Sequence, residues 1–337
     1  MILLRKILFP LAFLYWLITF IRNWLYDKGI IMSSSFDIPI IAVGNLSVGG
    51  TGKTPQIEYL IRLLSDKYKV AVLSRGYKRT SEGFILADEN ATASSIGDEP
   101  FQFYSKFPNI QVAVDANRKN GIENLLQLSN KPDVILLDDA FQHRKVKAGF
   151  YILLTAYDDL FCDDYILPFG NLREPSSGKK RADMIIVTKC PNDLSEIAQQ
   201  KIREKLKVKQ QVFFTTIQYD DFVFGNDSQL LVSEIQSESK VLVAGIAKPK
   251  LFFDFLKNEK DETLVFPDHH HFSKQDCEQI LAKANGRKII TTEKDFVRLN
   301  GLLPKEQLFY LPIKSTFLNT NIDKTIEDYV GQSSRNS

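Results

Sequence analysis

The sequence predicts an α/β protein built on a mostly parallel sheet with helices on both faces, followed by a second, smaller α/β domain. Three observations lead to this fold class. Short apolar runs of strand length alternate with helical stretches, which is typical of parallel strands joined by crossover helices. A glycine-rich turn directly follows the first strand-like run. The 337 residues are also enough for about two domains, each with its own core.

The chain begins with an apolar segment, and we expect residues 1–30 to form a membrane-associated helix. Residues 7–21 are interrupted only by Pro10 and Thr19, and basic residues flank them. Fifteen helical residues span about 22 Å, which is less than the ~30 Å hydrocarbon core of a bilayer. A signal peptide starts in the same way, but no small-residue cleavage site follows here.

Three interpretations of this segment remain: a buried helix that packs on the first domain, a monotopic anchor in the cytoplasmic leaflet, or a spanning helix, which the short length favours least. Tyr15, Trp16, Trp24 and Tyr26 carry the amphipathic rings that are favoured at a membrane interface. Basic residues on both sides of the run would lie near anionic headgroups. We therefore expect the anchor.

A strand over Ile40–Gly44 leads into the glycine-rich turn and then into a helix over Pro55–Leu64. This order is the context in which a Gly-Lys-Thr motif binds phosphate, because backbone N–H groups and the helix N-terminus face the anion. The predicted nucleotide-binding residues are Ser47, Val48, Gly49, Gly50, Thr51, Gly52, Lys53 and Thr54.

Within this turn, Lys53 is expected to reach the β- and γ-phosphates, and the Thr54 hydroxyl is expected to hold Mg²⁺. Ser47 stands where the general pattern has glycine. The alternative is a flexible glycine turn with a chance Lys-Thr pair after it. The strand before the turn and the helix after it favour a P-loop NTPase-like fold.

Further strands complete the expected P-loop domain of residues 31–216. They are Lys69–Ser74, Asp133–Asp139, Tyr151–Thr155 and Met184–Thr188. Residues 217–239 are polar and poorly periodic, so we expect a connector there. A smaller C-terminal domain over 240–330 would contain strands at 240–245 and 288–291, and residues 331–337 would be a disordered tail.

Composition excludes several classes of function. The net charge is +2, and no basic stripe with interleaved aromatic residues is present, so we expect no nucleic-acid partner. The three cysteines contain no C-x-x-C pair, which gives neither a zinc site nor a disulfide framework.

Acidic residues at two strand and helix ends are candidates for the chemistry. Asp138 and Asp139 end an apolar strand, where a carboxylate pair supports Mg²⁺ beside a triphosphate. Asp98 lies at an expected helix start and is either an N-cap or a general base for an alcohol nucleophile. His269, His270 and His271 are consecutive, so their side chains diverge and a zinc site is not favoured.

Six segments together resemble the tetraacyldisaccharide 4′-kinase family of lipid A biosynthesis, from the apolar amino terminus to about Leu299. They are Ser-Val-Gly-Gly-Thr-Gly-Lys-Thr-Pro at 47–55, Ser-Arg-Gly-Tyr at 74–77, Gly-Asp-Glu-Pro at 97–100, Asp-Asp-Ala-Phe-Gln-His-Arg at 138–144, Leu-Pro-Phe-Gly-Asn-Leu-Arg-Glu-Pro at 167–175 and Phe-Pro-Asp-His-His at 266–270.

The resemblance implies ATP-dependent phosphorylation of the 4′-hydroxyl of a tetraacylated glucosamine disaccharide 1-phosphate, giving lipid IVA. It implies a monotopic enzyme on the cytoplasmic face of the inner membrane, and we expect a monomer. Asp98 would accept the hydroxyl proton, with His269 paired to it and Lys53 at the phosphates. The residues expected to line the glycan and phosphate side are Asn45, Arg75, Tyr77, Arg118, Gln142, His143, Arg173 and Glu174.

The main alternative is a membrane-associated P-loop ATPase that acts as a switch or partitioning protein. Such proteins also combine a nucleotide-binding turn with an amphipathic segment. The run Thr188-Lys189-Cys190-Pro191 is similar to a guanine-reading [N/T]-K-x-D motif, but Pro191 replaces the Asp. A switch would also not need the segments around Asp98 and His269.

Overall fold

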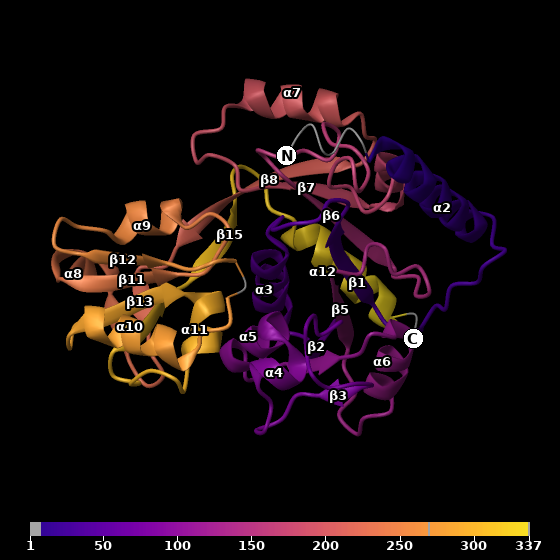
Figure 1. Cartoon of the computed structure of the whole chain (residues 1–337). Coiled ribbons are helices and arrows are strands. Elements are labelled where there is room, and N and C mark those ends of the chain that lie inside the picture. Colours follow the sequence, from indigo (N-terminus) through magenta and orange to yellow (C-terminus); the bar gives the residue numbers. More distant parts are fainter. Residues whose placement is uncertain (1–7, 269, 336–337) are drawn as a thin grey trace.

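A nine-stranded sheet forms the first domain of the computed structural model, which describes residues 8–268 and 270–335 (Figure 1). The strand order is β15-β8-β7-β6-β1-β5-β2-β4-β3, and only the two edge strands β3 and β15 run antiparallel to their neighbours. The strands are β1 (Ile40–Asn45), β2 (Val70–Ser74), β3 (Ile85–Leu86), β4 (Gln111–Val114), β5 (Val134–Asp138), β6 (Phe150–Ala156), β7 (Met184–Thr188), β8 (Gln211–Tyr219) and β15 (Ile313–Phe317).

Helices cover both faces of this sheet because its central strands are buried on both sides. In β1, Ile41 and Val43 join the core under α3, whereas Ile40 and Ala42 join the core under α6. The helical elements of this domain are α3 (Lys53–Leu64), α4 (Ala93–Ile96), α5 (Asp98–Lys106), α6 (Arg118–Leu126), η1 (Ser176–Arg181), α7 (Glu196–Leu206) and α12 (Asp323–Arg335). The predicted α/β class with helices on both faces is confirmed.

A six-stranded sheet forms the second domain, in the order β10-β9-β14-β13-β11-β12. Its strands are β9 (Phe222–Phe224), β10 (Gln229–Leu231), β11 (Lys240–Ala244), β12 (Glu262–Val265), β13 (Lys288–Thr292) and β14 (Leu308–Leu311). Its helices are α8 (Val232–Ser237), α9 (Lys250–Leu256), α10 (Lys274–Ala284) and α11 (Glu293–Leu299). Figure 1 shows this domain beside α3 and α5, with α11 next to α5.

Two expected boundaries need correction. Residues 217–239 are not a plain connector, because they hold the end of β8 together with β9, β10 and α8. Val223 and Ile235 are buried in the core of the second domain. These elements are only three to six residues long, so they give too little periodicity to be read from the sequence.

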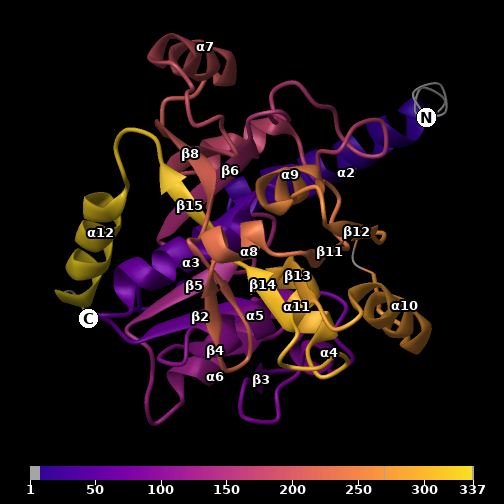
Figure 2. The ribbon, with the colours of Figure 1, turned by 90° about the vertical axis from the view of Figure 1, so that its left-hand side faces the viewer.

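The C-terminal segment also differs from expectation, since the chain returns to the first sheet after β14. Strand β15 pairs with β8, and α12 buries Ile326 and Val330 in the core that also contains α3 side chains. Figure 2 shows α12 away from the helices of the second domain. Residues 331–335 are therefore helical, in place of the expected disordered tail.

The predicted N-terminal helix is α2 (Phe9–Asp27), which lies at the edge of the first domain (Figure 1). Among its described residues, the structure buries Ala12. Large apolar side chains on it are exposed by 45–61%; these are Phe9, Leu11, Phe13, Leu14, Ile18, Phe20, Ile21 and Trp24. Over residues 8–268 and 270–335, no helix combines the length and apolar character needed to cross a membrane.

Candidate active site

The glycine-rich turn lies between β1 and α3, as predicted, and contacts from neighbouring strands hold its backbone. Gly49 and Gly52 have φ of 111° and 81°. These positive angles favour glycine, because a residue with a Cβ would be strained there. The Thr188 hydroxyl donates to the Thr51 carbonyl at 2.8 Å, and Lys189 Nζ donates to the Gly50 carbonyl at 2.6 Å. The turn is thus fixed by side chains from the end of β7.

Lys53 and Arg173 converge on one carboxylate next to this turn. Arg173 Nη1 donates to the two Asp139 carboxylate oxygens at 3.0 and 3.1 Å, and Lys53 Nζ lies 3.6 Å from Asp139 Oδ1. Asn45 Oδ1 accepts from both cations, at 2.9 Å from Arg173 and 3.4 Å from Lys53. Arg173 Nε also donates to the Ser47 carbonyl. The predicted substrate residues Asn45 and Arg173 therefore lie beside the glycine-rich turn.

The two acidic residues at the end of β5, Asp138 and Asp139, have opposite pKa shifts. Burial and the neighbouring Asp139 charge raise the pKa of Asp138 to about 6. Burial also acts to raise the pKa of Asp139, but Lys53 and Arg173 outweigh it and lower that pKa. Asp138 accepts a hydrogen bond from Ser74 Oγ at 3.0 Å. Adjacent carboxylates of this kind match the hard oxygen ligands of Mg²⁺, and so does the hydroxyl of Thr54, which follows Lys53 in the chain.

Arg118, predicted to bind substrate, is buried beside the end of β5 and does not line an open surface. It is 2% exposed, and its Nη1 and Nη2 donate to the carbonyls of Asp115 and Asp138 at 2.8 and 3.2 Å. Burial lowers the pKa of Arg118 to about 10. Its guanidinium therefore fixes the backbone at Asp138 and contributes positive charge from within the protein.

Asp98 begins α5, next to the helix that begins at Lys53. Gln102 Nε2 donates to Glu58 Oε1 at 2.8 Å, which ties α5 to α3 one to two turns from their first residues. Both helices run back from the carboxyl edge of the parallel sheet, so both N-termini lie at that edge. Arg298 of α11 contacts the Asp98 carboxylate.

The predicted partner of Asp98, His269, lies outside the described residues. The next residue, His270, does not reach Asp98; its Nε2 lies 3.0 Å from Asp276 Oδ2, and its ring stacks on Phe266 with centroids 5.0 Å apart. Over residues 8–268 and 270–335, no group of three or more His, Cys, Asp or Glu is arranged to hold a metal ion by itself.

Gln142 and Glu174 form a second polar cluster, which joins the site to α2. Arg181 donates to both Glu174 carboxylate oxygens at 2.8 and 2.9 Å, and Gln142 Nε2 donates to Glu174 Oε1 at 3.0 Å. From α2, Asn23 Nδ2 donates to Glu174 Oε2 at 2.8 Å, and Arg22 donates to the Gln142 carbonyl at 2.9 Å. The Tyr15 hydroxyl donates to the Arg173 carbonyl at 2.9 Å. Three polar side chains of the apolar helix thus bind site residues directly.

The remaining predicted substrate residues follow the ends of β2 and β5. Arg75 is exposed, and Tyr77 is 61% exposed. His143 is half-buried, and burial followed by the charge of Arg118 lowers its pKa to about 4, so the imidazole is neutral at pH 7. These residues are placed where a ligand beyond the strand ends would meet them.

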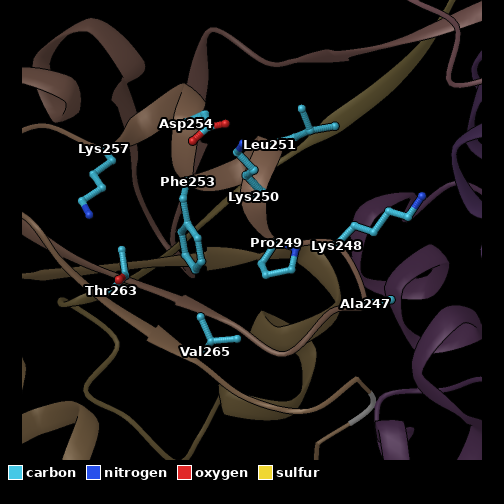
Figure 3. A pocket seen from close by; sticks show the side chains of 10 residues that line it. All are labelled: Ala247, Lys248, Pro249, Lys250, Leu251, Phe253, Asp254, Lys257, Thr263 and Val265. Atoms are coloured by element: carbon cyan, nitrogen blue, oxygen red, sulfur yellow. The ribbon is translucent and has the colours of Figure 1, made fainter.

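A cavity of about 620 Å³ lies in the second domain, between α9 and β12 (Figure 3). It contains none of the predicted site residues. In Figure 3 the Lys248 side chain extends from its rim toward the first domain. Burial, followed by the charges of Lys248, Lys294 and Lys53, lowers the pKa of Lys189. The second domain therefore adds positive charge near the glycine-rich turn.

Sequence reasoning missed two kinds of site contact. Lys189 was considered only as a part of a base-reading motif, although its amine donates to the Gly50 carbonyl of the glycine-rich turn. Arg298 lies 200 residues from Asp98 in a helix of the other domain, and no spacing rule connects them.

A glycine-rich turn before Lys53 and Thr54, an adjacent carboxylate pair and a third carboxylate on the neighbouring helix are the arrangement expected of a P-loop phosphotransferase. The model of the family Tetraacyldisaccharide-1-P 4′-kinase matches residues 4–330. The chain belongs to this family of kinases.

Relatives agree with this membership. The chain is 68% identical to Tetraacyldisaccharide 4′-kinase of Flavobacterium johnsoniae, with 97% of this chain and 98% of the relative covered. It is 45% identical to Tetraacyldisaccharide 4′-kinase of Bacteroides thetaiotaomicron, with 99% and 95% covered. A crystal structure of LpxK from Aquifex aeolicus in complex with ATP superposes with a TM-score of 0.78 at 30% identity, covering 98% and 99%. These findings favour the kinase over the ATPase switch.

Proposed function

We propose that this chain transfers the γ-phosphoryl group of ATP to the 4′-hydroxyl of a tetraacyldisaccharide 1-phosphate, forming lipid IVA. The observation that carries the residue roles is that α3 and α5 begin side by side at the carboxyl edge of the first sheet. Lys53 then meets the phosphates from one helix start, and Asp98 meets the acceptor hydroxyl from the other.

In this mechanism the protein positions reactants and neutralises charge, since phosphoryl transfer needs little covalent chemistry from side chains. Lys53 and Arg173 share the Asp139 carboxylate and would exchange part of that contact for phosphate oxygens. Thr54, Asp138 and Asp139 would hold Mg²⁺, which supplies further positive charge at the phosphates when bound. Asp98 takes the proton of the attacking hydroxyl.

The lipid substrate stays in a membrane, so the enzyme has to work at its surface. We propose a monotopic monomer on the cytoplasmic face of the bacterial inner membrane. The exposed apolar side chains of α2 support this location, and the contacts of Tyr15, Arg22 and Asn23 with the site support entry of the headgroup beside α2. Gln142, His143, Arg75 and Tyr77 would then lie on the glycan side.

A lipid phosphorylation assay tests the reaction. The purified full chain is incubated with γ-labelled ATP, Mg²⁺ and the acylated disaccharide 1-phosphate in detergent. Label in the lipid supports the proposal, whereas label released only as free phosphate contradicts it. Asp98→Asn should lower kcat by about 10²- to 10⁴-fold with little change in ATP affinity. Asp88→Asn, at an exposed turn of the same domain, is the matched control.

Vesicle binding tests the location. Wild type should sediment with vesicles that contain anionic phospholipid, and Phe13→Ser with Ile18→Ser in one chain should reduce the bound fraction. Ile197→Ser removes an apolar side chain that is 72% exposed on α7 and should leave binding unchanged. Equal binding of all three proteins would show that α2 does not contact the bilayer.

A further inference from the structure

Arg298 connects the second domain to the carboxylate that begins α5. Its Nε and Nη2 donate to Asp98 Oδ2 at 2.9 and 2.5 Å. The Arg298 side chain is 6% exposed and that of Asp98 is 24% exposed, so the contact lies largely away from solvent. A charge-assisted pair in this position is stronger than one on an open surface.

The Arg298 guanidinium also contacts Asp295, which lies one turn earlier in α11. Asp295 is fully buried, and its Oδ1 lies 3.4 Å from Arg298 Nη1. Asp295 Oδ2 in turn accepts from the Gly245 amide at 2.8 Å and from the Thr292 hydroxyl at 2.7 Å. These bonds link Arg298 to the ends of β11 and β13, so its position follows that of the second domain.

A second ion-pair cluster fixes the other end of the same helix pair. Lys106, at the end of α5, contacts Glu293 at the start of α11 and lies 2.7 Å from Glu58 of α3. Helices α5 and α11 are thus tied at both ends, and the tie includes the helix that begins at Lys53. The orientation of Asp98 relative to α3 is set by this three-helix contact.

We infer that Arg298 is a positioning residue for phosphoryl transfer, which holds the Asp98 carboxylate in the orientation required of the base. Both hydrogen bonds from Arg298 to Asp98 end on Oδ2, so they leave the Oδ1 atom of Asp98 for the attacking hydroxyl. The second domain thereby contributes to the catalytic geometry through the contact of Arg298 with Asp98. This inference rests on the proposed function, because it takes Asp98 as the base.

Steady-state kinetics on the full chain test the inference with three variants. Arg298→Ala should lower kcat about 10- to 100-fold, the size of effect expected for loss of a charge-assisted contact and a misplaced group. KM for ATP and for the lipid should stay near wild type. Arg298→Lys keeps one charged donor and should recover part of the lost kcat. Arg287→Ala breaks an Arg–Glu pair within the second domain and is the control.

A double-mutant cycle separates positioning from a general structural effect. With Asp98→Asn in place, Arg298→Ala should cause no further loss of kcat, because the group that it positions is already inactive. An unchanged kcat in Arg298→Ala, or an equal further loss in the Asp98→Asn background, overturns the inference. If Arg298→Ala does not fold, a loss of kcat by Arg298→Lys that is equal in the wild-type and Asp98→Asn backgrounds also overturns it. Near-wild-type activity of Asp98→Asn itself would instead remove Asp98 as the base, and the inference with it.

Discussion

Gly44 lies at a close approach between β1 and the loop after β5, and its replacement by alanine should damage stability and turnover together. A Cβ at this position would lie 2.7 Å from Phe141 Cβ and 2.9 Å from the Phe141 amide nitrogen. Ordinary carbon–carbon contacts are about 3.5–4.0 Å, so strand and loop would have to separate by about 1 Å.

The loop cannot move away without breaking contacts that build the site. The Ala140 amide donates to the Val43 carbonyl at 3.3 Å, and Gln142 Nε2 donates to the Asn45 carbonyl at 2.8 Å. Overpacking of this kind costs about 1–3 kcal/mol of unfolding free energy. A displacement of about 1 Å beside Asn45 and Asp139 should also lower kcat by about 100-fold.

Thermal unfolding and the lipid phosphorylation assay measure both effects. Each kcal/mol lost should lower Tm by roughly 2–4 °C in a domain of this size. Gly331→Ala is the matched control: its Cβ would lie 3.7 Å from the Tyr68 hydroxyl, and alanine in helix α12 should stabilise by up to about 1 kcal/mol. Wild-type Tm and kcat in Gly44→Ala would refute the close approach on which this reasoning depends.

Three further predictions follow from buried groups. Glu174→Gln leaves the Arg181 guanidinium without its charged partner, so the free energy of unfolding in denaturant should fall by about 3 kcal/mol. Glu123→Gln, in an exposed helix pair, is the control and should change that free energy by less than about 1 kcal/mol. Equal small changes in both variants would contradict the buried cluster. Ile326→Ala removes a fully buried side chain and should cost about 2–5 kcal/mol, and a negligible loss would show that α12 does not belong to the first core. The pKa of His143 is lowered to about 4 in the native state, against about 6.5 in the unfolded chain. Between these two pH values the unfolded chain binds a proton that the native protein does not, so the free energy of unfolding falls as the pH falls through this window. His143→Gln should reduce by up to one the number of protons that unfolding takes up in this window, so the free energy of unfolding should depend less steeply on pH. An unchanged slope would exclude the half-buried imidazole as the cause.

The sequence by itself determined the elements whose signal is local. β1, β2, β5, β7, β11 and β13 were predicted to within a residue or two, because each is a short apolar run buried on both sides. The glycine-rich turn between β1 and α3 could be predicted because glycines at fixed positions meet a specific backbone requirement. Residue order in six segments was enough to indicate the family, which the comparisons confirm.

Only the tertiary structure decided which distant residues share a site. Helix α12 returns to the first core, Asn23 of α2 binds Glu174, and Arg298 contacts Asp98 from the other domain. None of these contacts leaves a periodic pattern in the chain, because each depends on how sheets and helices stack after the local elements have formed. Short strands such as β9 and β10 were missed for the same reason: their stability comes from the neighbours that they pair with and not from their own three residues.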